Sequence, residues 1–375
     1  MKHIGIAVLI ACACFAPAAW GQKAAANSLN NWSELLRVDM TRYNPYEDTL
    51  NIDNVGNLEL KWSYTDYDYG CSGTAVINGV VYAGFGNGQE IAFDAVTGKK
   101  LWTYQTGNSI YSYSAVANGV VYFGSNDNNF YALKASTGAL LWSFTAGNQV
   151  SSAPTVVDGV VYVGAADDNL YAFNATTGAL LWSFRTGNGI YAAPAVVDGV
   201  VYFGSYDNNV YALNATTGAK IWSFTTGGFV DSAPAVTNGV VYVDSYDDNF
   251  YALDASTGAL LWKYTTGNNV LSDPAVSHGV VYFDSFDNYA YALDASTGAL
   301  RWKYDLGDIT GSGPAVANGL VFFTTNGGTT IALNAQTGAK LWSYQTGLPF
   351  LPAVVNGMVY IGDNESGTVY AFGLK

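Results

Sequence analysis

Apolar and polar positions recur along this chain with a fixed period of forty residues. In a unit near the middle of the chain, a run of apolar residues, Val200 to Phe203, is followed by a polar turn and a second apolar segment, Val210 to Leu213. The unit ends in Lys220 to Thr225, where apolar and polar side chains largely alternate. A fixed period of this length indicates a repeat protein, in which each unit buries its apolar faces only against its neighbours.

Each unit is predicted to form four strands. In the same unit we expect them at Ala192 to Val197, Val200 to Ser205, Val210 to Asn214 and Lys220 to Thr225. Asp198-Gly199 separates the first two, and Asn-Gly or Asp-Gly is the strongest short signal for a tight hairpin. The second strand is apolar on consecutive positions, which is typical of a strand covered on both faces, whereas the alternation of the fourth suits an outer strand.

Together the units predict an all-β fold, an eight-bladed β-propeller of four-stranded antiparallel blades. Seven units begin near residues 71, 111, 151, 191, 231, 271 and 311, and an eighth begins near Phe350 but reaches Lys375 before a fourth strand. The segment Leu58 to Tyr64 matches the fourth strand of the other units. This N-terminal strand is therefore expected to complete the last blade, which closes the ring and leaves no long exposed edge. The propeller domain is expected at residues 57–375.

The N-terminal segments are predicted to be an export signal and an arm. Residues 1–21 have a short positive start, an apolar core from Ile4 to Phe15 and small residues after it, as a signal peptide does. Leu9 to Cys12 has the outline of a lipoprotein box, but cleavage there would leave an apolar segment on the mature chain, so a lipid anchor at Cys12 is not expected. Residues 22–56 are polar and irregular, and we expect an arm along the ring. A periplasmic or secreted protein that does not span the membrane follows, because no other run is long and apolar enough.

The composition agrees with a β-rich fold and limits the partners. Half of the residues are apolar, 15% are aromatic and 12% are charged, and the formal net charge is −14. This charge repels phosphate backbones, so nucleic acid is not an expected partner. If the signal is removed after Gly21, Cys71 is the only cysteine left, so the mature chain can form no internal disulfide.

Two stretches carry a resemblance to a known family. Ala212 to Trp222 (ALNATTGAKIW) and Ala92 to Trp102 (AFDAVTGKKLW) closely resemble the tryptophan-docking motif of the pyrroloquinoline quinone (PQQ) repeat propellers. That family includes the quinoprotein alcohol dehydrogenases and the BamB-like propellers of the outer-membrane β-barrel assembly machine. The segment from Arg42 to Trp62 also resembles the one that enters the quinoprotein ring. In size the chain is closest to the non-enzymatic, BamB-like members.

The resemblance implies a structural role for one tryptophan in each unit. In the family this side chain wedges between adjacent blades over a Thr-Gly turn. Packing between blades is also the simplest physical explanation of a tryptophan that repeats on an outer strand. The expected docking residues are Trp62, Trp102, Trp142, Trp182, Trp222, Trp262, Trp302 and Trp342.

The resemblance also implies where an active site would lie. The enzymes of the family bind PQQ and calcium on the face that carries the loops between second and third strands and between blades. Their site needs cations for the three carboxylates of PQQ and usually has a disulfide between adjacent cysteines. In the blade-linking loops of this chain Arg185 is essentially the one candidate cation, and the ring has no cysteine pair and no long insertion. We therefore expect no catalytic residue, no enzyme activity and no PQQ or calcium cofactor.

Two sets of aspartates stand out. One recurs after the second strand of five units and is typical of an Asx turn. Its members are Asp127, Asp167, Asp207, Asp247 and Asp287. In the other set, Asp244 and Asp284 replace a glycine of the second strand, and Asp231 and Asp273 come from neighbouring first strands. Four carboxylates on adjacent blades predict a metal site for a hard cation such as calcium. The competing and simpler interpretation is an acidic rim exposed to solvent.

Positions that vary between units gather aromatic side chains on one face. They are Tyr111, Tyr113, Tyr191, Tyr206, Phe229, Tyr246, Phe286 and Phe350. Exposed aromatic clusters commonly mark contact surfaces, although drift in loop sequence would give the same scatter. The function expected from the sequence is therefore an exported, non-catalytic propeller that binds a protein partner in the cell envelope, including a role in envelope or outer-membrane protein assembly. The alternatives are a PQQ-dependent, quinoprotein-like oxidoreductase and a glycan-binding propeller.

Overall fold

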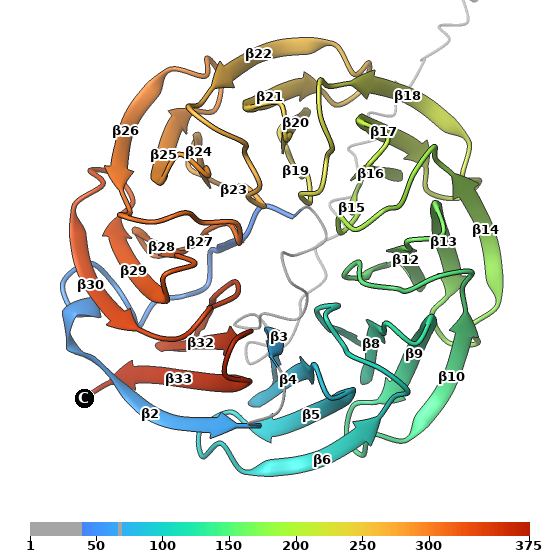
Figure 1. Cartoon of the computed structure of the whole chain (residues 1–375), viewed down its shortest axis with the longest axis horizontal. Coiled ribbons are helices and arrows are strands. Elements are labelled where there is room, and N and C mark those ends of the chain that lie inside the picture. The colour runs from blue at the N-terminus through green and yellow to red at the C-terminus, as the bar shows by residue number, and fades with distance from the viewer. Residues whose placement is uncertain (1–39, 67–69) are drawn as a thin grey trace, which may run out of the picture.

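Eight β-sheets are arranged in a ring around a central axis in the computed structural model, which describes residues 40–66 and 70–375 (Figure 1). Seven sheets have four strands and one has five. The eight-bladed propeller predicted from the sequence is thereby confirmed. The predicted signal peptide, Cys12 and residues 22–39 of the predicted arm lie outside the described residues.

Each blade begins with a short strand near the axis and continues outward. The innermost strands are β3 (Cys71–Ile77), β7 (Ala115–Ala117), β11 (Thr155–Val157), β15 (Ala195–Val197), β19 (Ala235–Thr237), β23 (Ala275–Ser277), β27 (Ala315–Ala317) and β31 (Ala353–Val355). The second strands are β4 (Val80–Phe85), β8 (Val120–Gly124), β12 (Val160–Gly164), β16 (Val200–Gly204), β20 (Val240–Asp244), β24 (Val280–Asp284), β28 (Leu320–Thr324) and β32 (Met358–Asp363).

The outer half of each blade follows the same order. The third strands are β5 (Gln89–Asp94), β9 (Asn129–Lys134), β13 (Asn169–Asn174), β17 (Asn209–Asn214), β21 (Asn249–Asp254), β25 (Tyr289–Asp294), β29 (Thr329–Asn334) and β33 (Thr368–Leu374). The outermost strands are β6 (Lys100–Gln105), β10 (Leu140–Thr145), β14 (Leu180–Arg185), β18 (Lys220–Thr225), β22 (Leu260–Thr265), β26 (Leu300–Asp305), β30 (Lys340–Gln345) and β2 (Leu58–Thr65). The chain also forms β1 (Tyr43–Asn44) and one 3-10 turn, η1 (Val55–Asn57). In the part of the chain described, no helix is long and apolar enough to cross a membrane.

The innermost strands are shorter than the sequence pattern predicts. We expected a strand from Ala192, but β15 begins at Ala195. Pro194 precedes it and has no backbone N–H to donate to the ladder, but β7 begins at the equivalent Ala115 after Ser114, so the short strand does not depend on proline. The hairpin that follows is as predicted: Asp198 and Gly199 both have positive φ, 50° and 76°, as a type I′ turn requires.

The two ends of the described chain meet in blade eight. β2 pairs antiparallel with β33, in a register that runs from Leu58 opposite Leu374 to Thr65 opposite Thr368. The N-terminal strand thus supplies the outer strand of the last blade, as predicted, and the two strands lie side by side at the edge of the ring (Figure 1).

The arm before β2 runs from the centre of the ring to its edge (Figure 1) and is hydrogen-bonded to blades six, seven and eight. The carbonyl of Thr41 accepts a hydrogen bond from the N–H of Val276 in blade six (2.8 Å). β1 then pairs in parallel with β27 as a fifth strand of blade seven. The Glu47 carboxylate accepts from the N–H of Gly357 in blade eight (3.1 Å). The arm is therefore part of the ring and not only laid along it.

The repeating tryptophans lie between neighbouring blades. The indole of Trp222 donates a hydrogen bond to the Ala255 carbonyl of the next blade (2.9 Å), and the Tyr202 hydroxyl donates to the same oxygen (3.1 Å). A Cβ built on Gly258, in the Thr-Gly turn, would lie 2.7 Å from the indole. Equivalent indole bonds join Trp62, Trp102, Trp142, Trp182, Trp262 and Trp302 to the next blade. Trp342 packs edge-on against Phe372 of blade eight, at 5.4 Å between ring centroids.

Removing one of these side chains is expected to destabilise the ring. Trp222→Ala leaves a cavity between two blades and removes one hydrogen bond, so the free energy of unfolding falls by about 3–5 kcal/mol. Ile221→Ala, on the same strand but 49% exposed, is the control and changes it by about 0.5 kcal/mol or less. Denaturant unfolding measures both. Equal stabilities of the two variants would contradict a packing role for the tryptophan.

Candidate functional site

Eight equivalent positions, one from each blade, surround the axis of the ring just before the innermost strands. They are Gly73, Tyr113, Ala153, Ala193, Ala233, Asp273, Gly313 and Leu351. Three of the alanines and Leu351 share one buried cluster with Met40, which comes from the arm. The arm therefore fills the centre of the ring, and the side chains around it differ from blade to blade.

Two glycines of this set make room for larger side chains. A Cβ on Gly73 would lie 1.6 Å from the Tyr113 ring, so this tyrosine packs directly against the glycine. A Cβ on Gly313 would lie 2.7 Å from Nη1 of Arg42. Gly313 also has φ of +76°, a conformation that other residues adopt only with strain. Where a unit has glycine in place of alanine, a larger side chain therefore occupies the space: Tyr113 at Gly73 and Arg42 at Gly313.

Arg42 is a buried cation of the arm that the sequence analysis did not identify as a site residue. Its side chain is fully buried, and Nη1 donates to the Ser312 carbonyl (3.1 Å) and lies 3.7 Å from Oδ2 of Asp273. Burial lowers the pKa of Arg42 to about 10, so the guanidinium stays charged at neutral pH. Nε and Nη2 have no hydrogen-bond partner within the described residues.

The four aspartates predicted as a metal site gather around this arginine in blades five and six. Asp244 and Asp284, at the ends of β20 and β24, are 1% and 0% exposed. Oδ2 of Asp244 accepts the N–H of Ser272 (2.9 Å), and the Ser272 hydroxyl accepts the N–H of Asp284 (3.0 Å). Both aspartates are therefore hydrogen-bonded to Ser272, Asp244 through its side chain and Asp284 through its backbone. The interpretation as a solvated acidic rim is wrong for these two residues, because the ring and the arm cover them.

The other two aspartates line a cavity. Asp231 accepts a hydrogen bond from the Tyr206 hydroxyl (2.7 Å), and Oδ1 of Asp273 accepts the N–H of Ala233 (2.7 Å). Both border a cavity of about 180 Å³, whose wall also contains Tyr113 and Tyr191. A pair of carboxylates on adjacent blades therefore reaches a space large enough for a small group.

Burial dominates the ionisation of these carboxylates. It raises the pKa of Asp231 to about 6 and that of Asp284 to about 7, and raises the pKa of Asp244 well above its usual value. Burial also raises the pKa of Asp273, against the opposing effect of Arg42. The site thus holds four carboxyls beside one arginine, and burial favours the protonated, neutral form of each carboxyl.

A metal site is not formed by these side chains as they lie. Within residues 40–66 and 70–375, no group of three or more Asp, Glu, His or Cys side chains is arranged to hold a metal ion. The structure brings the four predicted aspartates to one region but does not converge their oxygens on a common point. The metal site stays a prediction of the sequence.

Four of the predicted face residues form a continuous row of ring contacts. Tyr191 and Tyr206 lie 4.6 Å apart between ring centroids, and Tyr206 stacks on Phe229 at 4.9 Å with an interplanar angle of 4°. Tyr246 meets the other edge of Phe229 at 6.0 Å. Phe229 is 43% exposed. We call these four residues the aromatic ladder; it crosses the loops of blades four and five beside the cavity.

The remaining predicted face residues are more dispersed. Tyr111 is 38% exposed, and Phe286 is partly buried near Gly311. Tyr113 and Phe350 are also partly buried and pack edge-on at 5.8 Å between centroids near the axis. The eight residues therefore form one ladder and separate contacts, not one uniform patch.

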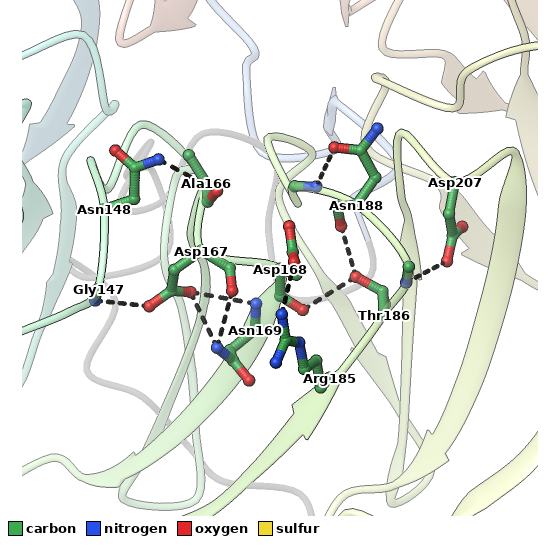
Figure 2. A network of polar contacts seen from close by, with 12 residues as sticks. Gly147, Asn148, Ala166, Asp167, Asp168, Asn169, Arg185, Thr186, Asn188 and Asp207 are labelled. Atoms are coloured by element: carbon green, nitrogen blue, oxygen red, sulfur yellow. Dashed lines mark hydrogen bonds and ion pairs between the residues drawn. The ribbon is translucent and has the colours of Figure 1, made fainter.

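The recurring aspartates form the predicted Asx turns and also join blades. In blade three, Oδ1 of Asp167 accepts the N–H of Asn169 (3.1 Å), which closes the turn (Figure 2). Oδ2 accepts the N–H of Gly147 (2.7 Å) in the segment that arrives from blade two. The same pair of bonds is made by Asp127, Asp207, Asp247 and Asp287.

Arg185, the cation expected in the blade-linking loops, does not reach the axis. It lies at the end of outer strand β14, its side chain is 74% exposed, and it pairs with Asp168 at 3.2 Å (Figure 2). The charged groups at the cavity are carboxylates, whereas a PQQ molecule brings three carboxylates of its own. The described residues at the cavity therefore do not supply the cations that PQQ needs.

The fold and the docking tryptophans define a β-propeller of the PQQ-repeat class. The family model described as outer membrane protein assembly factor BamB matches residues 87–205, 187–273, 207–305 and 257–375, and the chain belongs to this family. The resemblance seen in the sequence is confirmed.

Curated relatives match over short segments. A dehydrogenase subunit of the quinone-dependent alcohol dehydrogenase of Gluconobacter oxydans (strain 621H) is 46% identical over 65 residues, which is 17% of this chain and 8% of that protein. The corresponding subunit of Komagataeibacter europaeus is 46% identical over 78 residues, 20% of this chain and 10% of that protein. The matches thus span about a tenth of the relatives' length.

Solved structures share the ring over most of the chain. BamB from Moraxella catarrhalis has a TM-score of 0.72 and 21% identity, with 85% of this chain and 98% of that chain covered. A europium-containing methanol dehydrogenase has a TM-score of 0.80 and 15% identity, with 92% and 98% covered. The computationally designed Ika8 protein has a TM-score of 0.76 and 19% identity, with 84% and 100% covered. At these identities the likeness shows the fold alone.

One prediction from the sequence is wrong. The sequence predicts no enzyme activity. The matching curated relatives, however, are dehydrogenase subunits, and the fold is shared with alcohol and methanol dehydrogenases. Bare loops and a missing cysteine pair are therefore insufficient to separate this chain from the enzymatic members, because the blades are common to both.

Removing Arg42 is expected to destabilise the centre of the ring. Arg42→Met leaves Asp273 without its counter-ion, so the free energy of unfolding falls by about 3–5 kcal/mol at pH 8. The loss is smaller at pH 5, where more of the carboxyls are protonated. Arg301→Met is the control, since Arg301 forms an exposed surface pair with Asp294 at 2.8 Å and its loss changes stability little. A pH-independent loss would contradict the assigned ion pair.

The buried carboxyl of Asp284 predicts a second pH effect. Its pKa rises from 3.8 to about 7 on folding, so the folded state binds more protons between these values and the free energy of unfolding falls as pH rises through this window. Asp284→Asn removes this penalty and raises stability at pH 8 by roughly 4 kcal/mol at most, with almost no gain below pH 4. Asp158→Asn, in an exposed turn where other blades carry Asn, is the control. An equal gain at both pH values would contradict the shift.

Proposed function

We propose that this chain is an exported scaffold that binds another protein of the cell envelope through the aromatic ladder. The observation that carries the proposal is the ladder itself: Tyr191, Tyr206, Phe229 and Tyr246 stack in one row, and Phe229 at its centre is 43% exposed. Aromatic side chains supply large contact areas at a low entropy cost, and they are enriched at protein interfaces.

Internal comparison supports a role outside the fold for this row. The positions equivalent to Phe229 in the other full blades are Ser109, Gln149, Gly189, Asn269 and Ile309. Five different residues fit there, so the ring does not require an aromatic side chain. The four rings lie on the face where the blade-linking loops meet, and loops on a rigid scaffold are where binding residues concentrate.

Membership of the BamB family and the similarity of the ring to BamB from Moraxella catarrhalis support the scaffold role and the envelope location. The pattern of residues 1–21 supports export. Within the cell envelope, a partner engaged in outer-membrane protein assembly is the partner we propose.

A substitution in the ladder tests this role. Phe229→Ser with Tyr246→Asn introduces residues that blade two already carries at the equivalent positions, Ser109 and Asn126, so the ring stays folded. Tagged full-length chains are cross-linked in the envelope of the native organism. Each captured protein is then purified, and its affinity for the chain is measured. We expect a partner that binds the unmodified chain and loses at least tenfold in affinity with the double variant.

The control is Val96→Thr on the opposite face, where Val96 is 78% exposed and blades three and four carry Thr176 and Thr216. This variant is expected to bind like the unmodified chain. If no purified protein distinguishes the ladder variant from this control, the ladder is not a protein-binding surface. Retention on a glycan array that depends on Phe229 would point to the glycan-binding alternative.

A PQQ-dependent oxidoreductase is the second candidate function, and the 46% identity with dehydrogenase subunits is the observation that favours it. The test adds PQQ and calcium to the purified chain, then measures a quinone absorbance band and dye reduction with alcohols or sugars. Stoichiometric binding with turnover would establish this function. Unaltered absorbance and no turnover would remove it.

A further inference from the structure

A cavity beside the aromatic ladder has walls that combine carboxylates and aromatic rings. It has a volume of about 180 Å³ and is bordered by Asp231, Asp273, Tyr113, Tyr191 and Leu271. This volume corresponds to on the order of six water molecules at about 30 Å³ each. It is therefore large enough for the end of one side chain and too small for a folded segment.

Four carboxyls and one basic side chain lie at or behind the cavity among the described residues. Asp231 and Asp273 reach the cavity, and Asp244 and Asp284 lie behind its wall residue Ser272. The basic side chain is Arg42, whose Nη1 lies 3.7 Å from Oδ2 of Asp273. Asp231 is bound by a tyrosine hydroxyl rather than by a cation.

Several buried polar atoms at this place also lack partners among the residues described. Neither carboxylate oxygen of Asp284 is hydrogen-bonded, although the hydroxyls of Ser272 and Thr310 lie near enough to lower its pKa, and Oδ1 of Asp244 is likewise unpaired. The Ser232 hydroxyl likewise lies near enough to Asp244 to lower its pKa, and Nε and Nη2 of Arg42 also lack partners. Buried polar groups are normally satisfied, but these unpaired groups lie behind the wall residue Ser272 and include both donors and acceptors. The charged groups that a ligand would meet in the cavity itself are Asp231 and Asp273.

We propose that the cavity receives an arginine side chain from the protein partner. This inference rests on the proposed scaffold function and names the chemistry of its partner. A guanidinium is planar and weakly hydrated, donates several hydrogen bonds to carboxylates and stacks on aromatic rings. Asp231 and Asp273 supply the acceptors, and Tyr191 supplies the aromatic wall. A bare metal ion fits less well, because no group of three described ligands is arranged to hold one.

The proposal is tested with a single basic side chain on a neutral backbone. The probe is acetyl-arginine amide, and acetyl-citrulline amide has nearly the same shape without the charge. Saturation-transfer NMR with the full chain measures both. We expect saturable binding of the arginine probe and at least tenfold weaker binding of the citrulline probe. Equal binding of the two probes, or none of either, would overturn the proposal.

Charge-matched variants locate the site. Asp231→Asn is expected to weaken binding of the arginine probe at least tenfold. The control is Asp198→Asn, which removes the same charge at a hairpin turn of the opposite face, where other blades carry Asn118 and Asn238. Equal affinities of the two variants would mean that the probe responds to the net charge of −14 and not to the cavity.

Binding of the arginine probe is also expected to strengthen as the pH rises from 5 to 7.5, because Asp231 must ionise. The citrulline probe should show no such change. The groups that influence Asp231 and its neighbours are Tyr206, Tyr246, Tyr191, Asp273, Asp244, Asp284 and Arg42. Burial raises the pKa of Tyr206 and Tyr246, so a response centred near pH 6 reports the carboxyls. An affinity independent of pH would contradict the role of Asp231.

Failure of the inference can be distinguished from failure of the proposed function. If a purified partner depends on the aromatic ladder but the arginine probe does not bind, the scaffold function stands and the arginine site falls. If the probe binds through Asp231 and no protein depends on the ladder, the protein-binding function falls and the cavity remains a site for a small organic cation.

Discussion

The antiparallel pairing of β2 with β33 is the interaction on which the rest of the structure depends. Seven blades are continuous in sequence, but the eighth has its outer strand only when the two ends of the described chain meet. The same strand carries Trp62, whose indole reaches the Ala95 carbonyl of blade one at 2.9 Å. One strand therefore completes the last blade and docks it on the first, so that every blade has a neighbour on both faces.

The periodic part of this fold could be predicted from the sequence, and the reasons are local. The type I′ turn at Asp198-Gly199, the Asx turn at Asp167 and the outer-strand tryptophans each follow from residue chemistry within one unit. The innermost strands are shorter than predicted, because residues such as Ala193 continue the apolar pattern but lie at the axis, before the paired strand begins. The centre of the ring could not be predicted, because Arg42 lies outside the period and its position is fixed by contacts 231 residues away. The sequence does show Asp273 and Gly313 at a position where three other units have alanine. This difference can be interpreted only once the residues that occupy the axis are known.

Binding and catalysis use the same ring in this family, so the blades themselves do not decide the function. The difference lies where eight blades converge and each contributes one side chain to a shared space. In this chain that space is acidic and aromatic: Asp231 and Asp273 border the cavity, and the aromatic ladder adjoins it. This small region is therefore where the blades differ from one another, whereas the regular surface around it belongs to the repeated fold.

The arm also has a consequence for how the molecule can evolve. Its recorded backbone contacts and ion pair fall in blades six, seven and eight, so duplication or loss of a unit in blades two to five would leave them untouched. The width of the channel, however, is set by the number of blades, and Met40 fits a lining of Ala153, Ala193, Ala233 and Leu351. A ring of seven units would crowd Met40, and a ring of nine would leave empty space around it. The packing of Met40 therefore suits a ring of eight blades, and a change in the number of forty-residue repeats would disturb it.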